Sequence, residues 1–239
     1  MSKKDITAPL YHEAELYIQG YQLIGGIDEV GRGCIAGPVA AGVVIMPRGV
    51  TVKGVTDSKK LTAAERERLA VEIKRVALGY RVEFVAAEVI DAMGIEAAIY
   101  TAMTRAAEHM TLTGKTDITR PDYLLIDGKR GKLWDSYIIL YKHIIKGDSA
   151  SHSIAAASIL AKVERDAFMR EMHDSYLVYG FDQNKGYGTA AHMAAIAEHG
   201  VCPLHRKTFL TKHILREAAE GAAQYADNPT VKQTLEYGA

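Results

Sequence analysis

The sequence predicts an α/β fold with a mixed β-sheet flanked by helices and a helical C-terminal portion. The predicted strands fall mainly within the first 145 residues, and helices dominate after them. The first two strands follow each other as a hairpin, whereas the later strands alternate with helices. That combination is typical of a sheet with both antiparallel and parallel neighbours.

The apolar segment 23–46 predicts the first two strands, at about 23–30 and 39–46. It is rich in Val, Ile and Gly, and its glycines and Pro38 disfavour a helix. The connection, GRGCIAGP at 31–38, is neither a dinucleotide fingerprint nor a Walker loop, because its glycine spacing differs from both. Glycines on both sides of Arg32 permit close approach of a ligand to the backbone. The simpler interpretation is a tight hairpin connection.

The middle of the chain alternates between helix and strand signals. The sequence TAAE at 62–65 is a capping box, and it begins a helix that ends at Gly79. Residues 81–89 predict a strand. Asp91 then caps a second helix that runs to about Met110.

Two further strands and a helical remainder follow. Residues 123–126 predict a short buried strand that ends at Asp127, and residues 137–145 predict another strand. Residues 151–176 predict a long Ala-rich helix, capped by the serines at its start. Segments 189–199 and 208–223 predict the last helices.

The composition excludes several classes of protein. The 239 residues, 48% of them hydrophobic, suffice to bury a core, and no stretch of about 20 apolar residues predicts a membrane span. The N-terminus has no apolar signal-peptide core, and Cys34 and Cys202 form no CxxC pair. We therefore expect a cytoplasmic monomer with reduced thiols.

Charge is balanced over the whole chain but not within one segment. Lys plus Arg and Asp plus Glu are each 29, which excludes a globally basic protein but not a local basic face. Between 129 and 146, five basic residues stand against Asp135 and predict a phosphate-binding patch: Lys129, Arg130, Lys132, Lys142 and Lys146. A solvated lysine-rich loop is the simpler alternative.

Four acidic residues lie in or at the ends of predicted strands: Asp28, Glu29, Asp127 and Asp148. If these strands are neighbours, the carboxylates converge and repel one another. Bound Mg²⁺ or Mn²⁺ usually neutralises such a repulsion. Taken singly, each acid also suits a turn or a helix cap. Asp28 and Glu29 are adjacent, so in a regular strand they point to opposite faces unless the strand ends or bulges, or Glu29 reaches around.

The segment GIDEVGRGCIAGP at 26–38 resembles the N-terminal signature of ribonuclease HII. Later segments continue the resemblance in the same order: DSKKL (57–61), LLIDG (124–128), KGD (146–148), AASILAKVERD (156–166), GYGT (186–189) and HR (205–206). Each motif alone is weak, but the ordered set is specific and spans about residues 23–210.

The resemblance implies a ribonuclease H-like fold and a metal-dependent endoribonuclease. Such an enzyme cleaves the RNA strand of RNA–DNA hybrids and nicks 5′ to single ribonucleotides in duplex DNA, leaving 3′-hydroxyl and 5′-phosphate ends. It also implies four catalytic carboxylates that hold two divalent cations, Mn²⁺ or Mg²⁺. They are Asp28, Glu29, Asp127 and Asp148.

The resemblance assigns substrate contacts as well. Gly31, Arg32 and Gly33 would read the 2′-hydroxyl, mostly through backbone groups. Tyr187 would stack on the sugar of the deoxynucleotide that follows the ribonucleotide, although a packed core aromatic is the alternative. Lys59 would contact a phosphate, and Lys162 is a possible further contact.

The chain divides into four predicted parts. We expect a lead-in at 1–22, a ribonuclease H-like catalytic domain at 23–180, a helical C-terminal portion at 181–225 and a frayed tail at 226–239. The sister family, ribonuclease HIII, usually carries a larger N-terminal domain, so ribonuclease HII is the better match.

Three other functions stay open at this point. They are a ribonuclease HIII-like hybrid nuclease, a non-catalytic nucleic-acid-binding module and a hydrolase of small phosphate esters. The histidines at 192, 199 and 205 match no standard zinc spacing, so we expect surface or packing roles for them.

Overall fold

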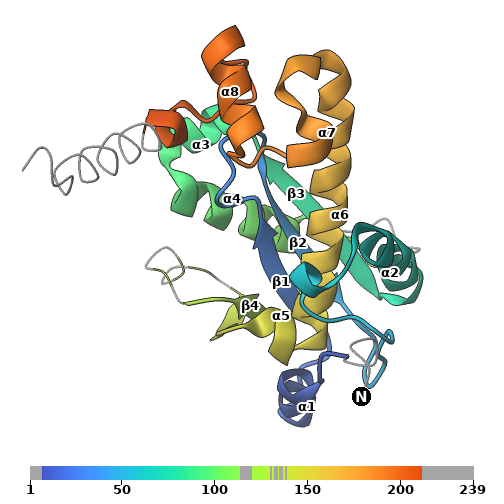
Figure 1. Cartoon of the computed structure of the whole chain (residues 1–239). Coiled ribbons are helices and arrows are strands. Elements are labelled where there is room, and N and C mark those ends of the chain that lie inside the picture. Colours follow the sequence, from blue (N-terminus) through green and yellow to red (C-terminus); the bar gives the residue numbers. More distant parts are fainter. Residues whose placement is uncertain are drawn as a thin grey trace, which may run out of the picture.

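The computed structural model describes residues 7–113, 120–129, 131, 134, 137 and 139–211 (Figure 1). Five strands of this part of the chain form one sheet in the order β3-β2-β1-β4-β5. They are β1 (Ile24–Val30), β2 (Val39–Ile45), β3 (Gly79–Val85), β4 (Tyr123–Asp127) and β5 (Leu140–Ile144). The β1–β2 and β2–β3 pairs are antiparallel, and the β1–β4 and β4–β5 pairs are parallel. The predicted mixed sheet is confirmed, with β1 at its centre.

Helices cover both faces of the sheet (Figure 1). On one face, α6 (His152–Ser175) packs against β1 and β2, and α2 (Ala63–Val76) packs against α6. On the other face, α4 (Ile95–Glu108) packs against β2 and β3, next to α3 (Ala87–Met93). The sequence of β2 explains this arrangement, because Val43 faces the α4 side and Val44 faces the α6 side.

The remaining helices lie at the two ends of the molecule (Figure 1). Helix α1 (Tyr11–Ile18) lies near the N-terminus, and the short α5 (Gly147–Ala150) precedes α6. Beyond α6 the chain forms η4 (Leu177–Tyr179), α7 (Phe181–Asn184) and α8 (Ala190–His199). A short 3-10 turn, η2 (Ser58–Lys60), precedes α2.

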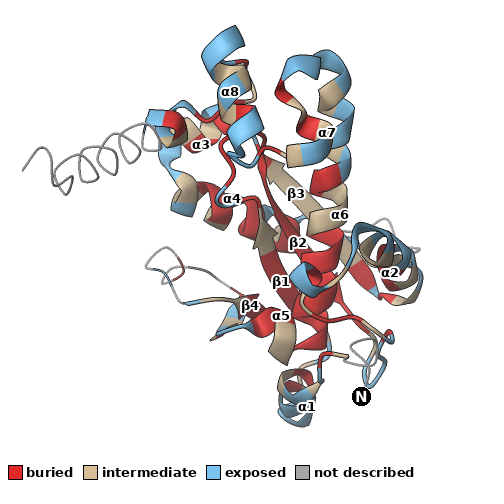
Figure 2. Cartoon of the chain, in the orientation of Figure 1, coloured by how far each residue is buried: buried red, intermediate tan, exposed pale blue. Residues whose placement is uncertain are grey.

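Helix α6 approaches the sheet very closely, because both surfaces are made of small residues. A Cβ atom on Gly42 would lie 2.6 Å from the carbonyl oxygen of Ala157, so β2 tolerates only glycine at this position. The alanines of the first three turns of α6 are fully buried, and Figure 2 shows this helix buried against the sheet. The Ala-rich sequence of 151–176 therefore predicts correctly both a helix and its tight packing.

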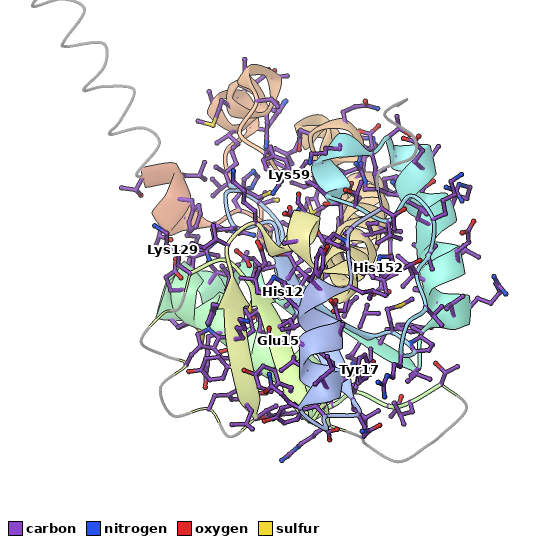
Figure 3. The ribbon with its side chains drawn as sticks, turned by 90° about the horizontal axis from the view of Figure 1, so that it is seen from below. His12, Glu15, Tyr17, Lys59, Lys129 and His152 are labelled. Atoms are coloured by element: carbon purple, nitrogen blue, oxygen red, sulfur yellow. The ribbon has the colours of Figure 1, made fainter. Side chains whose placement is uncertain are left out.

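The lead-in packs onto the body of the protein through a buried carboxylate. Glu13, on α1, is only 3% exposed. Its Oε1 accepts hydrogen bonds from Ser151 Oγ (2.6 Å) and from the Ser153 main-chain N–H (2.9 Å). Tyr17 on the same helix donates to the Met46 carbonyl (3.3 Å), and Figure 3 shows α1 from below. Residues 7–18 thus hold the start of α6 in place.

The capping predictions for two helices are confirmed. The Thr62 side chain accepts from the Glu65 N–H, and the Glu65 carboxylate accepts from the Thr62 N–H, which completes the capping box. Ser151 caps α6 by accepting from the Ile154 N–H. The helix predicted at 189–199 is α8, with Thr189 as its cap.

The prediction for 81–93 is wrong in two respects. The strand begins at 79 and ends at 85, and residues 87–89 belong to α3. Asp91 does not begin a helix but lies inside α3, and Gly94, at φ 82°, separates α3 from α4. The run of Val and Ala at 85–89 suits a strand and a helix equally, so only tertiary packing decides between them.

Asp91 caps a different helix. Its carboxylate accepts from the main-chain N–H groups of Lys207 (2.8 Å) and Thr208 (3.0 Å). Residues 207–211 are helical, and the remainder of the helix predicted at 208–223 lies outside the described residues, as does the predicted tail at 226–239.

The predicted strand at 137–145 is shorter in the structure, Leu140–Ile144. Among the described residues, no helix combines the length and the apolar character needed to cross a bilayer. The division of the chain into domains stays a prediction.

Candidate active site

Strand β1 presents Asp28 and Glu29 on opposite faces of the sheet. Its pairing with β2 is regular at both positions, Asp28 with Gly42 and Glu29 with Ala41, so no bulge brings the two side chains to one face. Asp28 is buried on the α6 side, and its Oδ1 accepts a hydrogen bond from the Glu29 main-chain N–H (2.8 Å). Glu29 faces the α4 side and lines a pocket there.

The parallel neighbour β4 brings Asp127 alongside. The β1–β4 register pairs Ile27 with Ile126, so Asp28 and Asp127 extend from the same edge of the sheet. Asp127 Oδ1 accepts a 2.6 Å hydrogen bond from the Gly147 main-chain N–H. Asp148 is the next residue after Gly147. It does not close the preceding strand, as predicted, but lies in the short helix α5, four residues after the end of β5.

The acidic cluster, defined as Asp28, Glu29, Asp127 and Asp148, is electrostatically coupled. Burial raises the pKa of Asp28 well above its ordinary value, and the charges of Glu29 and Asp127 raise it further. The pKa of Asp127 is raised by burial and by Glu29, although the Gly147 N–H opposes this. Burial, Asp57 and Asp127 raise the pKa of Asp148. The structure thus brings together the four acids that the sequence analysis selected.

Two basic side chains face this negative charge. Arg32 donates through Nε to Glu29 Oε1 (2.8 Å) and also pairs with Glu96. Lys59 Nζ lies 3.7 Å from Asp148 Oδ2 on an exposed side chain. Burial alone would lower the pKa of Lys59, but the surrounding carboxylates, Asp148 first, raise it. Both predicted substrate contacts therefore lie beside the acidic cluster.

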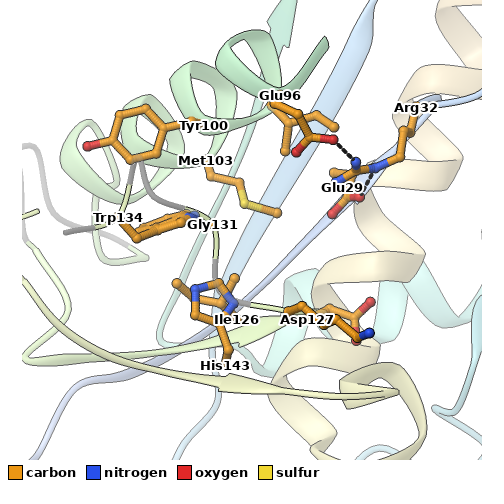
Figure 4. Close-up of a pocket in the computed structure, with 12 residues that line it drawn as sticks. Glu29, Arg32, Glu96, Tyr100, Met103, Ile126, Asp127, Gly131, Trp134 and His143 are labelled. Carbon is orange, nitrogen blue, oxygen red and sulfur yellow. Dashed lines mark hydrogen bonds and ion pairs between the residues drawn. The ribbon is translucent and has the colours of Figure 1, made fainter.

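A pocket of about 280 Å³ opens next to these acids (Figure 4). Glu29 and Asp127 line it together, although they come from different strands. Part of its wall is apolar and includes Tyr100, Met103 and Trp134. Carboxylates from both sides of β1 and β4 thus reach a common space at this edge of the sheet.

Two buried arginines hold the connection at 31–38, hereafter the 31–38 loop. Arg206 donates to the carbonyls of Gly31 (2.8 Å), Gly37 (2.9 Å) and Arg32 (3.2 Å). Arg165 donates to the carbonyls of Pro38 (2.8 Å) and Ala36 (3.1 Å). Both arginines are 0% exposed. The loop is therefore an eight-residue connection held in place by two buried side chains, and not merely a tight hairpin connection.

Gly31 is required for this arrangement. Its φ is +92°, and a Cβ atom would lie 2.2 Å from Arg165 Nε. Any other residue would strain the backbone and displace the arginine that supports the loop.

Tyr187 lies on the neighbouring loop before α8, and its ring is 42% exposed. The Gly186 carbonyl accepts from the N–H groups of Ile35 (2.9 Å) and Ala36 (3.1 Å), which fastens this loop to the 31–38 loop. Lys162 Nζ lies 5.7 Å from the centre of the Tyr187 ring and donates to Asp166 Oδ1 (2.7 Å). Lys162 thus belongs to the surroundings of Tyr187.

Comparisons with known proteins agree on one family. A family model described as Ribonuclease HII matches residues 25–212. Ribonuclease HII of Chlamydia caviae is 48% identical over 198 residues, which cover 82% of this chain and 88% of that protein. The chain belongs to the ribonuclease HII family. It is accordingly an endoribonuclease of the ribonuclease H type.

Solved structures support the fold. Ribonuclease H2 of Pyrococcus horikoshii OT3 superposes with a TM-score of 0.63 at 24% identity, covering 82% of this chain and 97% of that chain. Ribonuclease HII of Archaeoglobus fulgidus, solved as a complex with PCNA, gives a TM-score of 0.62 at 24% identity, covering 77% and 94%. The ribonuclease H-like fold implied by the sequence is confirmed.

The donor chemistry of this ribonuclease HII-family site suits hard divalent cations, because carboxylate oxygens predominate. In the described part of the chain, no group of three or more His, Cys, Asp or Glu side chains is arranged to hold a metal ion as it stands. Arg32 on Glu29 and Lys59 near Asp148 neutralise part of the charge instead.

The predicted basic patch is only partly a free surface. Lys142 Nζ pairs with Glu15 of α1 at 3.1 Å, so this lysine already forms an ion pair with the lead-in. Lys129 lines the pocket beside Asp127, whereas Arg130 and Lys132 lie outside the described residues. Figure 3 labels Glu15 and Lys129.

Three residues near the site were missed by the sequence analysis: Asp57, Arg165 and Arg206. Asp57 caps η2 by accepting from the Lys59 N–H (2.9 Å), and its charge raises the pKa of Asp148. All three lie within the segments that carried the family resemblance. The Asp57–Lys59 cap is local, but the contacts of Arg165 and Arg206 with the 31–38 loop join residues far apart in the sequence.

Proposed function

We propose that this enzyme cleaves the RNA strand of RNA–DNA hybrids and nicks duplex DNA on the 5′ side of a single ribonucleotide. The observation that carries the proposal is the convergence of the acidic cluster beside the 31–38 loop and Tyr187. A cluster of carboxylates at one sheet edge is suited to phosphodiester hydrolysis without a protein nucleophile. The neighbouring loops supply groups for recognising a ribose.

Asp28, Glu29, Asp127 and Asp148 would hold two divalent cations, Mn²⁺ or Mg²⁺. Such a pair, when bound, activates water and stabilises the departing 3′ oxygen. Burial raises the pKa of Asp28, and the charges of Glu29 and Asp127 raise it further, so a positively charged occupant would relieve an unfavourable charge there. Cleavage in this manner leaves a 3′-hydroxyl and a 5′-phosphate.

Lys59 is suited to bind the substrate backbone. Its side chain is 84% exposed, and its Nζ lies near Asp148 without direct hydrogen-bond contact, at 3.7 Å. A long, mobile cation at the rim of the acidic cluster can turn toward a phosphate, and its charge offsets the repulsion between phosphate and carboxylates.

Discrimination between RNA and DNA requires a group that detects the 2′-hydroxyl. We assign this role to the backbone of Gly31, Arg32 and Gly33. Rigid support by Arg165 and Arg206 favours the assignment, because a fixed backbone group can distinguish one hydroxyl from none. Tyr187, half-exposed on the adjacent loop, would stack on the sugar of the next deoxynucleotide.

The test uses an end-labelled DNA duplex containing one ribonucleotide, next to a long RNA–DNA hybrid, in Mg²⁺, Mn²⁺ or EDTA. Nicking 5′ to the ribonucleotide that depends on metal and disappears in Asp127→Asn is the expected result. Cleavage of the hybrid alone would instead indicate a ribonuclease HIII-like preference. Binding of both substrates by the folded protein with no cleavage would indicate a binding module. The cytoplasmic location and the monomeric state stay predictions.

A further inference from the structure

Two buried histidines lie directly behind Tyr187. His192 belongs to the first turn of α8, and His205 lies in the segment that bridges to Ala36. Both are almost completely buried, at 0% and 2% exposure. Their Nε2 atoms are 3.1 Å apart, and the described contacts of the acidic cluster include neither ring.

The hydrogen bonds around the pair define the position of every ring proton. The Cys202 main-chain N–H can only donate, and it points at His205 Nδ1 (2.9 Å), so that nitrogen carries a lone pair. A neutral His205 therefore has its proton on Nε2 and donates it to His192 Nε2. His192 must then be protonated on Nδ1, which lies 2.9 Å from the Tyr187 carbonyl oxygen. The chain of donors runs in one direction, from Cys202 to Tyr187.

The surroundings favour the neutral form of both rings. Phe181 meets His192 edge-on with ring centres 5.4 Å apart, and Tyr179 meets His205 at 4.8 Å. Burial and the neighbouring His192 lower the pKa of His205 to about 4, and burial lowers the pKa of His192. A proton added to His192 would place two N–H groups face to face across 3.1 Å.

The Tyr187 carbonyl is the point at which this chain acts on the site. It accepts from His192 Nδ1 and from the Thr189 N–H (2.9 Å), while the Tyr187 N–H donates to the Asn184 carbonyl (2.9 Å). These bonds hold the main chain of Tyr187 on both sides of its Cα atom. The ring is half-exposed and Lys162 lies over its face, so its direction depends on this contact and on the backbone that carries it.

We propose that His192 and His205 form a neutral, one-directional hydrogen-bond relay that positions Tyr187 for recognition of the ribonucleotide–deoxynucleotide junction. The inference rests on the proposed function for the role of Tyr187 but not for the relay itself. His192 and His205 are positioning residues, since they act on the substrate through Tyr187.

The relay is tested without substrate by ¹⁵N NMR of histidine-labelled protein at neutral pH. His192→Asn and His205→Asn identify the signals of the two rings. The expected result is a proton on Nδ1 of His192 and on Nε2 of His205. The opposite tautomer at either ring, or a charged ring at neutral pH, overturns the relay.

The positioning role is tested with two amide substitutions at the same position. The amide of His192→Asn reaches the place of Nδ1 and can still donate to the Tyr187 carbonyl, whereas that of His192→Gln reaches the place of Nε2 and cannot. We measure the ratio of cleavage at a single ribonucleotide to cleavage of a long hybrid. His192→Gln is expected to lower this ratio about two- to tenfold, the range for loss of one hydrogen bond. His192→Asn should keep it within about twofold.

Equal ratios in both variants and the wild type would overturn the positioning role. A second pair of variants, at His205, tests the same role if His192→Gln folds poorly. His205→Gln retains the hydrogen-bond donor to His192, and His205→Asn removes it. The expected order is a lower ratio in His205→Asn than in His205→Gln. Failure of the wild-type enzyme to nick at single ribonucleotides would contradict the proposed function. The tautomers of the two histidine rings test the relay independently of that function.

Discussion

The main-chain N–H of Gly147 donates a 2.6 Å hydrogen bond to Asp127 Oδ1, which joins the end of β4 to the residue before Asp148. Two acids separated by 20 intervening residues are thereby held by one backbone contact. An asparagine at 127 would keep this bond, since its Oδ1 also accepts. Asp127→Asn therefore removes charge with little change in geometry.

We predict that Asp127→Asn lowers metal-dependent cleavage more than about 100-fold, since even residues behind metal ligands contribute 10- to 100-fold. In EDTA the same variant should melt about 2–4 °C higher, as about 1 kcal/mol of charge repulsion is relieved. Activity assays and thermal melts check the two results. Asp174→Asn, at an exposed position of α6, is the control and should change neither. Full activity in Asp127→Asn would contradict the assignment of the acidic cluster.

Arg206→Met should destabilise the fold by about 3 kcal/mol, because three loop carbonyls lose their buried donor. Urea denaturation measures the change in the free energy of unfolding. Arg170→Met removes an arginine that is exposed and pairs with Glu67, so its effect should stay within about 0.5 kcal/mol. Similar losses in the two variants would mean that the 31–38 loop does not depend on Arg206.

Tyr187→Ala should reduce nicking at single ribonucleotides by about tenfold or more and cleavage of long hybrids much less, since stacking contributes about 1–3 kcal/mol per contact. Parallel kinetics on the two substrates check this. The matched control is Tyr11→Ala, at a position 80% exposed on α1. Equal losses on both substrates would count against a junction role.

Lys59→Met is expected to raise KM about two- to tenfold and to reduce the salt dependence of substrate binding by about one phosphate contact. Binding at several salt concentrations measures the slope. Lys74→Met serves as the control, because Lys74 pairs with Glu164 of α6 and not with a member of the acidic cluster. An unchanged slope in Lys59→Met would remove Lys59 from the substrate interface.

The pH dependence of stability should report His205. Its pKa is about 4 in the folded protein and about 6.5 when unfolded, so the unfolded chain binds more protons between these values. The contribution of the neutral His205 ring to the free energy of unfolding is fully present above about pH 6.5 and is lost as pH falls through about 4. The groups that face the ring are His192, Tyr179 and Cys202. Urea denaturation from pH 7 to pH 4 should show a steeper loss in the wild type than in His205→Gln, and parallel curves would contradict the assignment.

Much of the site could be predicted because strand patterns are local. The apolar runs before Asp28 and Asp127 define strands, and acids at the ends of neighbouring parallel strands meet at one edge. Asp148 was placed correctly in space but assigned to the wrong element, because KGD follows the strand only after a turn. The caps Thr62 and Ser151 were also predictable, since such caps act within one helical turn, whereas Asp91 caps a helix far along the chain.

The supporting contacts could not be predicted in the same way. Arg206 lies 175 residues from Gly31, and no periodicity or cap relates them. A buried arginine also runs against composition-based expectation, which places arginines at the surface. The break between α3 and α4 was missed for a different reason, since Gly94 follows a segment that suits either secondary structure.

The contacts of Arg165 and Arg206 with the 31–38 loop go to main-chain carbonyls, which every amino acid provides. Side chains at the exposed loop positions, Arg32 and Gly33, can therefore change during evolution while the two guanidinium groups keep the loop backbone in its shape. The loop thus separates shape, which the arginines conserve, from surface chemistry, which remains open to variation. Directed evolution of sugar selectivity could begin with libraries at these positions.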